Sequence, residues 1–210
     1  MTNNTSIIHT PIIAFEDYLE QYDGRRAEWV NGEVIAMSPV TVDHERKRKY
    51  LLMVFEAYFA LRPIGQVLGE PVVMRLSARP SGREPDLFIH LNNNAAVLRD
   101  TYLDGPADIC IEIISVSTQE RDRGEKFIEY EEGGVTEYWI IDPDRRDALF
   151  YRANAQGRYQ RADLNPQAEY QTPLLPGLRL HVPTLWQEPL PDVIAIVDLV
   201  RAMLATGDAS

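Results

Sequence analysis

A strand–helix–strand unit between Asp108 and Asp142 constrains the fold of this chain more than any other feature of the sequence. The segment 108–115 is apolar on both faces of a two-residue alternation, which is typical of a central strand covered on both sides. A Ser-x-x-Glu capping box, Ser117 to Glu120, marks the start of a helix, and Gly133-Gly134 supplies its stop. The segment Glu137–Ile141 then returns as a strand. Such a unit predicts two parallel strands joined by a right-handed crossover.

Turn residues and the spacing of apolar residues predict the remaining elements. Asn31-Gly32 is typical of a tight type I′ turn and places a hairpin over Ala27–Met37. Helical spacing predicts helices over Ala14–Tyr22, Asp43–Leu61 and Pro191–Leu204. Further strands are expected at Gln66–Leu76, with Pro71 inside it, and at Pro85–Ile89, Asp147–Tyr151, Arg158–Arg161 and Leu178–Val182, with loops over Ser77–Arg83 and Ala95–Gly105.

Length and composition limit the classes of protein that this chain can be. The 210 residues fit one domain with additions, and an apolar fraction of 45% is enough for a core. The net charge of −11 argues against a general phosphate-binding surface, so any nucleic-acid contact must come from local basic patches. Cys110 is the single cysteine and is expected to be an inert core thiol in a reducing compartment. The longest apolar run, Leu51–Leu61, contains Glu56 and is too short for a membrane span, so we expect a cytoplasmic protein without a membrane segment.

Three residues, Asp86, Glu112 and Lys126, carry the strongest chemical signal. Glu112 lies within an apolar strand, where a carboxylate is costly unless a cation, a donor or a metal meets it. Asp86 opens a second strand, and two carboxylates brought together repel each other unless a divalent cation lies between them. Lys126 lies on the predicted helix, from which an ammonium could polarise a water or steady a phosphate transition state. Each residue alone also fits a structural role, as a turn residue, a core ion-pair member or a solvated helix charge, but together they favour a site.

Basic residues crowd the N-terminal half of the longest predicted helix, from Arg46 to Lys49. The helix dipole disfavours cations there. The run is either a solvated face balanced by Asp43 and Glu45, or a patch from which Arg46 and Lys49 contact the phosphates of a nucleic acid. The sequence has no Gly-rich phosphate loop after a strand, no Gly-x-Ser-x-Gly elbow and no histidine pair at metal-ligand spacing. The missing phosphate loop counts against dinucleotide-binding and P-loop folds. The missing elbow and histidine pair count against a serine hydrolase of that type and against a histidine-based metal site.

Six strings of the sequence, in their order and spacing, resemble the Uma-two-type family of restriction-endonuclease-like proteins, within the PD-(D/E)xK nuclease superfamily. The strings are AEWVNGEVIAMSP, VDHERKRKYLL, EPDLFIH, IEIISVST, KFIEYEEGGVTEYWIIDP and LLPGLRL. The resemblance runs from about Ala27 to about Trp186, which is most of the chain. It implies a restriction-endonuclease-like fold of the mixed α/β class, with a mixed central β-sheet flanked by helices and added β-hairpins. It also implies a phosphodiesterase site that uses Mg²⁺, for which Mn²⁺ could substitute.

The resemblance also implies roles for individual residues. The aspartate of the PD motif is Asp86 and the strand glutamate is Glu112, and these two would hold Mg²⁺ with a carbonyl from Ile113. The usual lysine of the superfamily motif would fall at position 114, where this chain has Ile114. The Uma-two-type family resembles this chain in carrying its lysine on the next helix, where Lys126 stands.

The family's histidine and its early glutamate resemble His44 and Glu28. His44 either caps or packs at the start of its helix, or faces the site. Glu28 either completes the metal shell or pairs with Arg25 or Arg26. The family usually has proline after the strand serine, and this chain has Val116, which loosens that turn but leaves the site intact.

Taken together, the sequence predicts a metal-dependent endonuclease that hydrolyses phosphodiester bonds of DNA, with Lys126 orienting the attacking water or stabilising the developing charge. The alternative is a nuclease-fold nucleic-acid-binding or regulatory protein without turnover, with which the acidic composition and the shifted lysine are also consistent. A homodimer is expected because cutting both strands needs two sites. The predicted organisation is a lead-in with a short helix (1–26), a nuclease-like domain (27–186), and a C-terminal helix (187–210) packed on that domain or on a partner.

Overall fold

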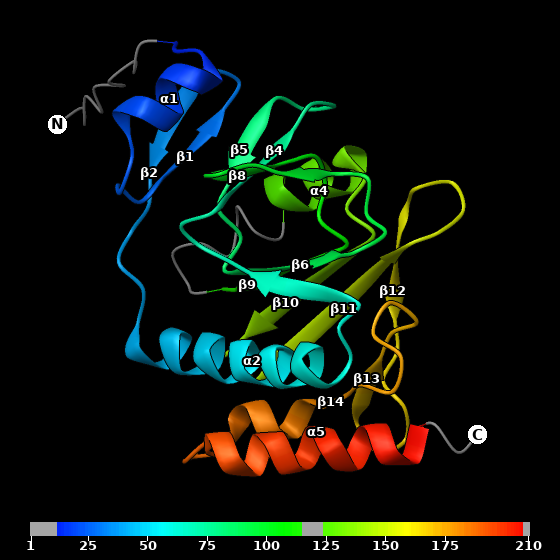
Figure 1. The fold of residues 1–210 in the computed structure, drawn as a ribbon. Helices are drawn as coiled ribbons and strands as arrows, with labels where there is room; N and C mark the ends of the chain where they lie inside the picture. Colours follow the sequence, from blue (N-terminus) through cyan, green and yellow to red (C-terminus); the bar gives the residue numbers. More distant parts are fainter. Residues whose placement is uncertain (1–11, 115–123, 208–210) are drawn as a thin grey trace, which may run out of the picture.

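Two six-stranded sheets with helices packed around them make up the fold (Figure 1). The structure is a computed structural model and describes residues 12–114 and 124–207. The central sheet has the strand order β12-β11-β10-β9-β6-β3, formed by β3 (Gly65–Leu68), β6 (Leu87–Leu91), β9 (Ile109–Ile113), β10 (Glu137–Asp142), β11 (Asp147–Ala153) and β12 (Tyr159–Ala162). The N-terminal sheet has the order β2-β1-β5-β4-β8-β7, formed by β1 (Ala27–Val30), β2 (Glu33–Ala36), β4 (Val73–Leu76), β5 (Ser81–Arg83), β7 (Val97–Leu98) and β8 (Tyr102–Asp104).

Helices cover these sheets, and a small third sheet pairs β13 (Glu169–Gln171) with β14 (Arg179–His181). The helices are α1 (Phe15–Gln21), α2 (Val42–Leu61), α4 (Glu125–Gly133) and α5 (Val193–Gly207), with a 3₁₀ turn η1 (Val182–Trp186). The predicted mixed sheet flanked by helices is therefore confirmed. None of the described helices is both long enough and apolar enough to cross a membrane.

The predicted parallel pair lies at the centre of the central sheet. β9 runs parallel to β10 and antiparallel to β6, and all five of its residues are buried. Alternate residues of β9 enter different cores: Ile111 packs in the core under α2, whereas Cys110 packs in the core that contains Tyr130 of α4. Glu112 has the same parity as Cys110, so it points toward α4.

α2 covers the other face of the central sheet, and α5 lies on the outer side of α2 (Figure 1). The buried stripe of α5, Ile196, Val200 and Met203, shares one core cluster with α2. The last helix therefore packs on its own chain, although Val193, its first residue, is exposed.

Three predictions between residues 66 and 105 are wrong. The segment Gln66–Leu76 forms two strands in different sheets, because the chain changes sheet at 69–72, where Pro71 has no N–H for a sheet ladder. The predicted loop Ser77–Arg83 contains β5, and the predicted loop Ala95–Gly105 contains β7 and β8. Each of these strands has only two or three residues, too few to show an alternation.

The crossing between the sheets depends on Gly69. A Cβ atom added there would lie 2.2 Å from the carbonyl oxygen of Asp86, so no side chain fits. The next amide, that of Glu70, donates a hydrogen bond to the carbonyl of Pro85 at 3.0 Å. This close approach of two backbones brings Glu70 beside Asp86.

Two local signals from the sequence are confirmed. Asn31 and Gly32 both have positive φ, at 51° and 91°, as a type I′ turn requires. Gly134 caps α4 in the left-handed region at φ 91°. The predicted capping box from Ser117 to Glu120, and Val116, lie outside the described residues.

Candidate functional site

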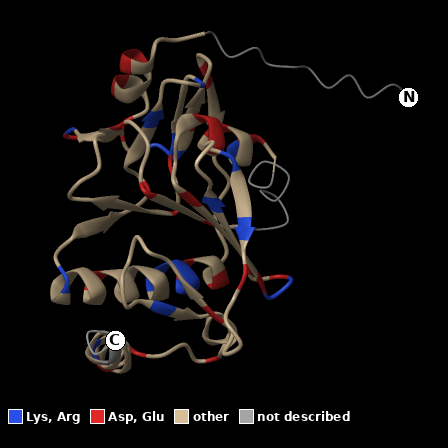
Figure 2. Ribbon diagram, turned by 90° about the vertical axis from the view of Figure 1, so that its right-hand side faces the viewer, with Lys and Arg blue, Asp and Glu red and all other residues tan. Residues whose placement is uncertain are grey.

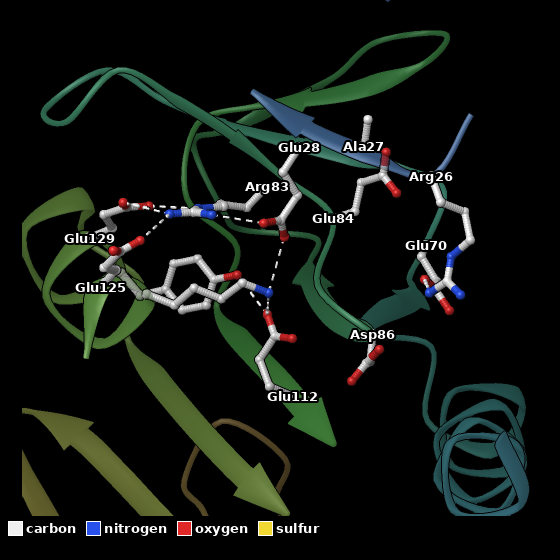
Figure 3. A network of polar contacts seen from close by, with 12 residues as sticks. Arg26, Ala27, Glu28, Glu70, Arg83, Glu84, Asp86, Glu112, Glu125 and Glu129 are labelled. Carbon is white, nitrogen blue, oxygen red and sulfur yellow. Dashed lines mark hydrogen bonds and ion pairs between the residues drawn. The ribbon is translucent and has the colours of Figure 1, made fainter. Parts of the chain in front are cut away.

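Buried charges gather where the two sheets meet (Figure 3). The N-terminal sheet supplies Glu28 from β1 and Arg83 from β5, the central sheet supplies Glu112 from β9, and α4 supplies Lys126. Asp86 stands just before β6. Each of these five residues is at most 7% exposed. Charges buried this deeply need partners.

Lys126 lies between two carboxylates. Its Nζ atom is 2.9 Å from Oε1 of Glu112 and 3.0 Å from Oε1 of Glu28. Tyr130, one turn further along α4, donates its hydroxyl to the same Oε1 of Glu112 at 2.8 Å. Because Lys126 is only 1% exposed, the role of a solvated helix charge is wrong for it. The cation that an acid in an apolar strand requires is supplied to Glu112 by Lys126.

Arg83 fixes the other side of Glu28. Its Nη1 donates to Oε2 of Glu28 at 2.7 Å, and its Nε and Nη2 donate to the two oxygens of Glu129 at 2.8 and 2.7 Å. Burial alone would raise the pKa of Glu28, but the charges of Lys126 and Arg83 outweigh burial and lower that pKa to about 2. Glu28 is therefore ionised, and it pairs with these two cations rather than with the arginines that precede β1.

A second group, His44, Glu70 and Asp86, lies beside this network, with one ligand atom of each within 4.8 Å of the others. Nε2 of His44 is 3.1 Å from Oδ1 of Asp86, at an angle outside hydrogen-bond geometry, so this buried nitrogen has no aligned partner within 12–114 and 124–207. The backbone amide of Ile113 donates to Oδ2 of Asp86 at 2.6 Å and orients the carboxylate. Burial alone would lower the pKa of His44, but the adjacent Asp86 outweighs it and raises that pKa above its ordinary value.

The donors of this group fit a divalent cation. Carboxylate oxygens are preferred ligands of Mg²⁺ and Mn²⁺, and an imidazole suits transition metals. His44 is available as a ligand because Thr41, not His44, caps α2 with its side chain. Glu70 is held in place by Arg26, whose Nη2 lies 2.5 Å from Oε2 of Glu70. Of the ligands predicted from the sequence, Asp86 belongs to the group.

The other two predicted ligands have different contacts in the structure. Glu112 is bound to Lys126 and Tyr130, and Ile113 contributes its amide to Asp86. A direct role for the Ile113 carbonyl, and for Glu112, in holding a cation stays a prediction.

Glu84 adds a buried carboxyl with unusual acidity. Its pKa is raised to about 7, first by burial and then by the nearby charge of Glu28. The hydroxyl of Tyr18 donates to the carbonyl of Ala27 at 2.5 Å and also lies 3.4 Å from Oε1 of Glu84. Glu84 therefore changes its protonation near neutral pH, whereas Glu28 stays ionised.

The basic run on α2 divides into two halves. Lys47 pairs with Asp43, and Arg48 pairs with Glu45 at 2.8 Å, which is the balanced face that the sequence suggested. The remaining pair, Arg46 and Lys49, is exposed and has no ion-pair partner among the described residues. Figure 2 shows the Lys and Arg positions on the ribbon of this long helix.

A sequence profile of the Uma2 family, described as "Putative restriction endonuclease", matches residues 15–183 of the chain. The chain belongs to the Uma2 family. The matched range contains all the buried charges of the site described above. No curated protein matches this Uma2 chain.

The Uma2 chain is also similar to a solved crystal structure, that of a protein from Anabaena variabilis described as a "putative nuclease belonging to DUF820". The two structures superpose with a TM-score of 0.67 over 83% of this chain and 97% of the other, at 18% sequence identity. At this identity, the likeness establishes the fold that the two chains share.

Several residues of the Uma2 site were missed from the sequence, namely Glu70, Arg83, Glu84, Glu129 and Tyr130. Glu70 lies in a segment that was predicted to be the inside of one strand, and Arg83 lies in a predicted loop. For Tyr130, the available signal was its spacing of four residues from Lys126, which places both side chains on one face of a helix.

Proposed function

We propose that this chain is a metal-dependent nuclease that hydrolyses phosphodiester bonds of DNA, with Mg²⁺ or Mn²⁺ held by His44, Glu70 and Asp86. The observation that carries this proposal is the position of that ligand group beside a buried, paired lysine. A hydrogen bond links the two groups directly. The carboxylate of Asp86 accepts it from the amide of Ile113, the residue that follows Glu112. Membership of the Uma2 family supports the nuclease class.

In this proposal the metal ligands and the buried lysine have different roles in the reaction. A bound divalent cation would polarise a phosphate oxygen and make a coordinated water more acidic. Glu28 and Glu112 hold the Nζ atom of Lys126 between them, at 3.0 and 2.9 Å. From that position Lys126 orients the attacking water or stabilises the charge that develops on the phosphate. In this proposal Glu112 acts on the reaction through Lys126, and Asp86, fixed in advance by the backbone, receives the cation.

Nicking of supercoiled plasmid by the purified protein tests this proposal. Cleavage should require Mg²⁺ or Mn²⁺ and should be abolished by Asp86→Asn, which keeps the volume of the side chain and removes its charge. Asp144→Asn is the matched control, because Asp144 is an exposed aspartate outside the site and its substitution changes the net charge equally. A wild-type protein that neither binds these cations nor nicks DNA would contradict the proposal.

A second function, nucleic-acid binding or regulation without turnover, is favoured by one observation. The charges of Glu28, Arg83, Lys126 and Glu112 have partners inside the protein, as in a buried network that serves the fold. The same plasmid assay separates the two functions, because a silent protein would bind DNA and leave it intact at saturating Mn²⁺.

The expected homodimer stays a prediction. Cleavage of both strands of a duplex would need two copies of the site. Light scattering of the purified chain, with and without DNA, measures whether such a dimer forms.

A further inference from the structure

A groove of about 390 Å³ lies between the N-terminal half of α2 and the segment Gln187–Pro191, which leads into α5. The α2 side presents Arg46, Lys49 and Met53. The opposite side presents the main chain and side chains of 187–191, whose conformation is restricted by two prolines. This volume lies within the range of pockets that hold small organic ligands.

The groove has a small excess of positive charge in an acidic protein, because Arg46, Lys47 and Lys49 outnumber Asp43 and Glu188 among its lining residues. Its cations Arg46 and Lys49 are exposed and have no ion-pair partner among the described residues, whereas the acid Asp43 is already neutralised by Lys47. Arg46 and Lys49 lie about one turn apart on α2, so both can contact the same anionic group at the groove.

The lining of the groove has an apolar part and a polar part. The apolar part, which we call the floor, consists of Tyr50, Met53 and Leu190, and the polar part includes Gln187 and Glu188. An unpaired nucleotide needs these three surfaces: cations for its phosphate, an apolar surface for the face of its base, and donors and acceptors for the edge of that base. A duplex would leave the floor empty, because its bases are stacked inside the helix.

We infer that this groove binds one unpaired nucleotide of single-stranded DNA, to one side of the phosphodiester that reacts. The inference rests on the proposed nuclease function, and it names the form of DNA that the protein takes: a single strand, a frayed end or a flap, rather than an intact duplex.

The position of the groove on α2 fixes where this nucleotide lies relative to the reaction. His44 faces Asp86, whereas Arg46, two residues later, is turned about 200° around the axis of a helix with about 100° per residue. The groove and the ligand group therefore flank the N-terminal end of α2 on different sides. Because the helix is about 10–12 Å across, the bound nucleotide is a few nucleotides away from the bond that is cut.

Fluorescence anisotropy with two probes tests the inference: fluorescein-labelled dT12, and a duplex of the same length. EDTA is present, so binding is measured without cleavage. We expect the wild type to bind dT12 more tightly than the duplex. The double variant Arg46→Gln/Lys49→Gln should lower the salt dependence of dT12 binding by about 0.7, since the one phosphate that both cations contact adds about 0.7 to the slope on a single strand.

A second double variant, Met53→Ser/Leu190→Ser, removes the apolar floor without changing charge. It should weaken dT12 binding by about tenfold, the scale of one lost base contact, and leave the salt slope unchanged. Arg146→Gln/Arg161→Gln is the control, because it removes two exposed arginines from elsewhere and should bind dT12 as the wild type does. Urea unfolding of each variant confirms that it is folded.

Two results would overturn the inference: a duplex bound as tightly as dT12, or an unchanged dT12 affinity in the floor variant. Plasmid nicking in Mn²⁺, measured in parallel, separates this failure from that of the proposed function. Nicking by a protein without single-strand preference refutes the groove and keeps the nuclease. Floor-dependent binding of dT12 by a protein that cuts nothing keeps the groove and refutes the nuclease.

Discussion

Glu28→Gln is the substitution that most directly examines the buried charge network. Glutamine keeps the shape of glutamate and resembles its protonated form, so the change removes one negative charge from between Lys126 and Arg83. Both cations would remain buried, with one carboxylate fewer to balance them. We expect the variant to fold less stably and to hold Lys126 less firmly.

The size of the effect follows from the acidity of Glu28. Its pKa is lowered from the ordinary value of 4.5 to about 2. A tenfold change in proton affinity corresponds to about 1.4 kcal/mol, so the ionised form contributes about 3 kcal/mol to the free energy of unfolding at neutral pH. Breaking a buried ion pair by removing one partner costs about 3–5 kcal/mol, which agrees.

The same pKa fixes the sign of the pH dependence. The pKa of Glu28 is lower in the folded state, so its contribution is complete above about pH 4.5 and is lost as the pH falls toward 2. The difference in stability between wild type and variant should therefore fall to less than half of its neutral value by about pH 3.

Urea unfolding from pH 3 to pH 7 in EDTA measures this difference. Glu33→Gln is the matched control, because Glu33 is exposed on β2 and its substitution changes the net charge from −11 to −10 in the same way. A difference below about 1 kcal/mol at pH 7, the scale of a surface pair, would refute the network argument. So would a difference that does not change between pH 3 and pH 7.

Three further substitutions address the rest of the site. Lys126→Met should lower the nicking rate by a factor on the order of 10² or more, while calorimetric titration shows that Mn²⁺ still binds. Glu70→Gln should weaken Mn²⁺ binding by at least about tenfold in the same titration, because it removes a ligand that the sequence did not reveal. Gly69→Ala should cost about 1–3 kcal/mol in urea unfolding and also weaken Mn²⁺ binding, since its Cβ would push against the carbonyl of Asp86, 2.2 Å away, and displace Glu70.

The sequence predicts the elements whose signals are local. The unit β9–α4–β10 follows from an apolar run and a glycine stop, and the first hairpin follows from Asn31-Gly32. β5, β7 and β8 have no such signal, because strands of two or three residues form only where a neighbouring strand offers its ladder. The split of 66–76 likewise depends on which sheet each half joins, which is a long-range property.

The candidate site shows the same limit. Glu112 was found because an acid in an apolar strand is an anomaly, and the anomaly correctly required a partner. The sequence grouped Lys126 with Glu112 in one site but gave Lys126 a role on water or phosphate. That Lys126 pairs directly with Glu112 depends on how α4 packs over β9. Arg83 was hidden in a segment with loop-like composition, yet it is fully buried once β5 pairs with β1 and β4.

The site is divided between two sheets, and this affects the order in which parts of the protein unfold on heating. Glu28 and Arg83 belong to β1 and β5, which pack at the small aromatic core around Phe15 and Tyr18. Glu112 belongs to β9 of the central sheet, beside the larger core that contains Cys110 and Tyr130. Proteins open locally, and units with fewer buried apolar contacts open first. The buried charge network would then come apart when β1 and β5 detach, while the central sheet is still intact. Hydrogen exchange should be faster at the amides of β1 than at those of β9, and the lifetime of the assembled site at a given temperature would follow the exchange rate of β1.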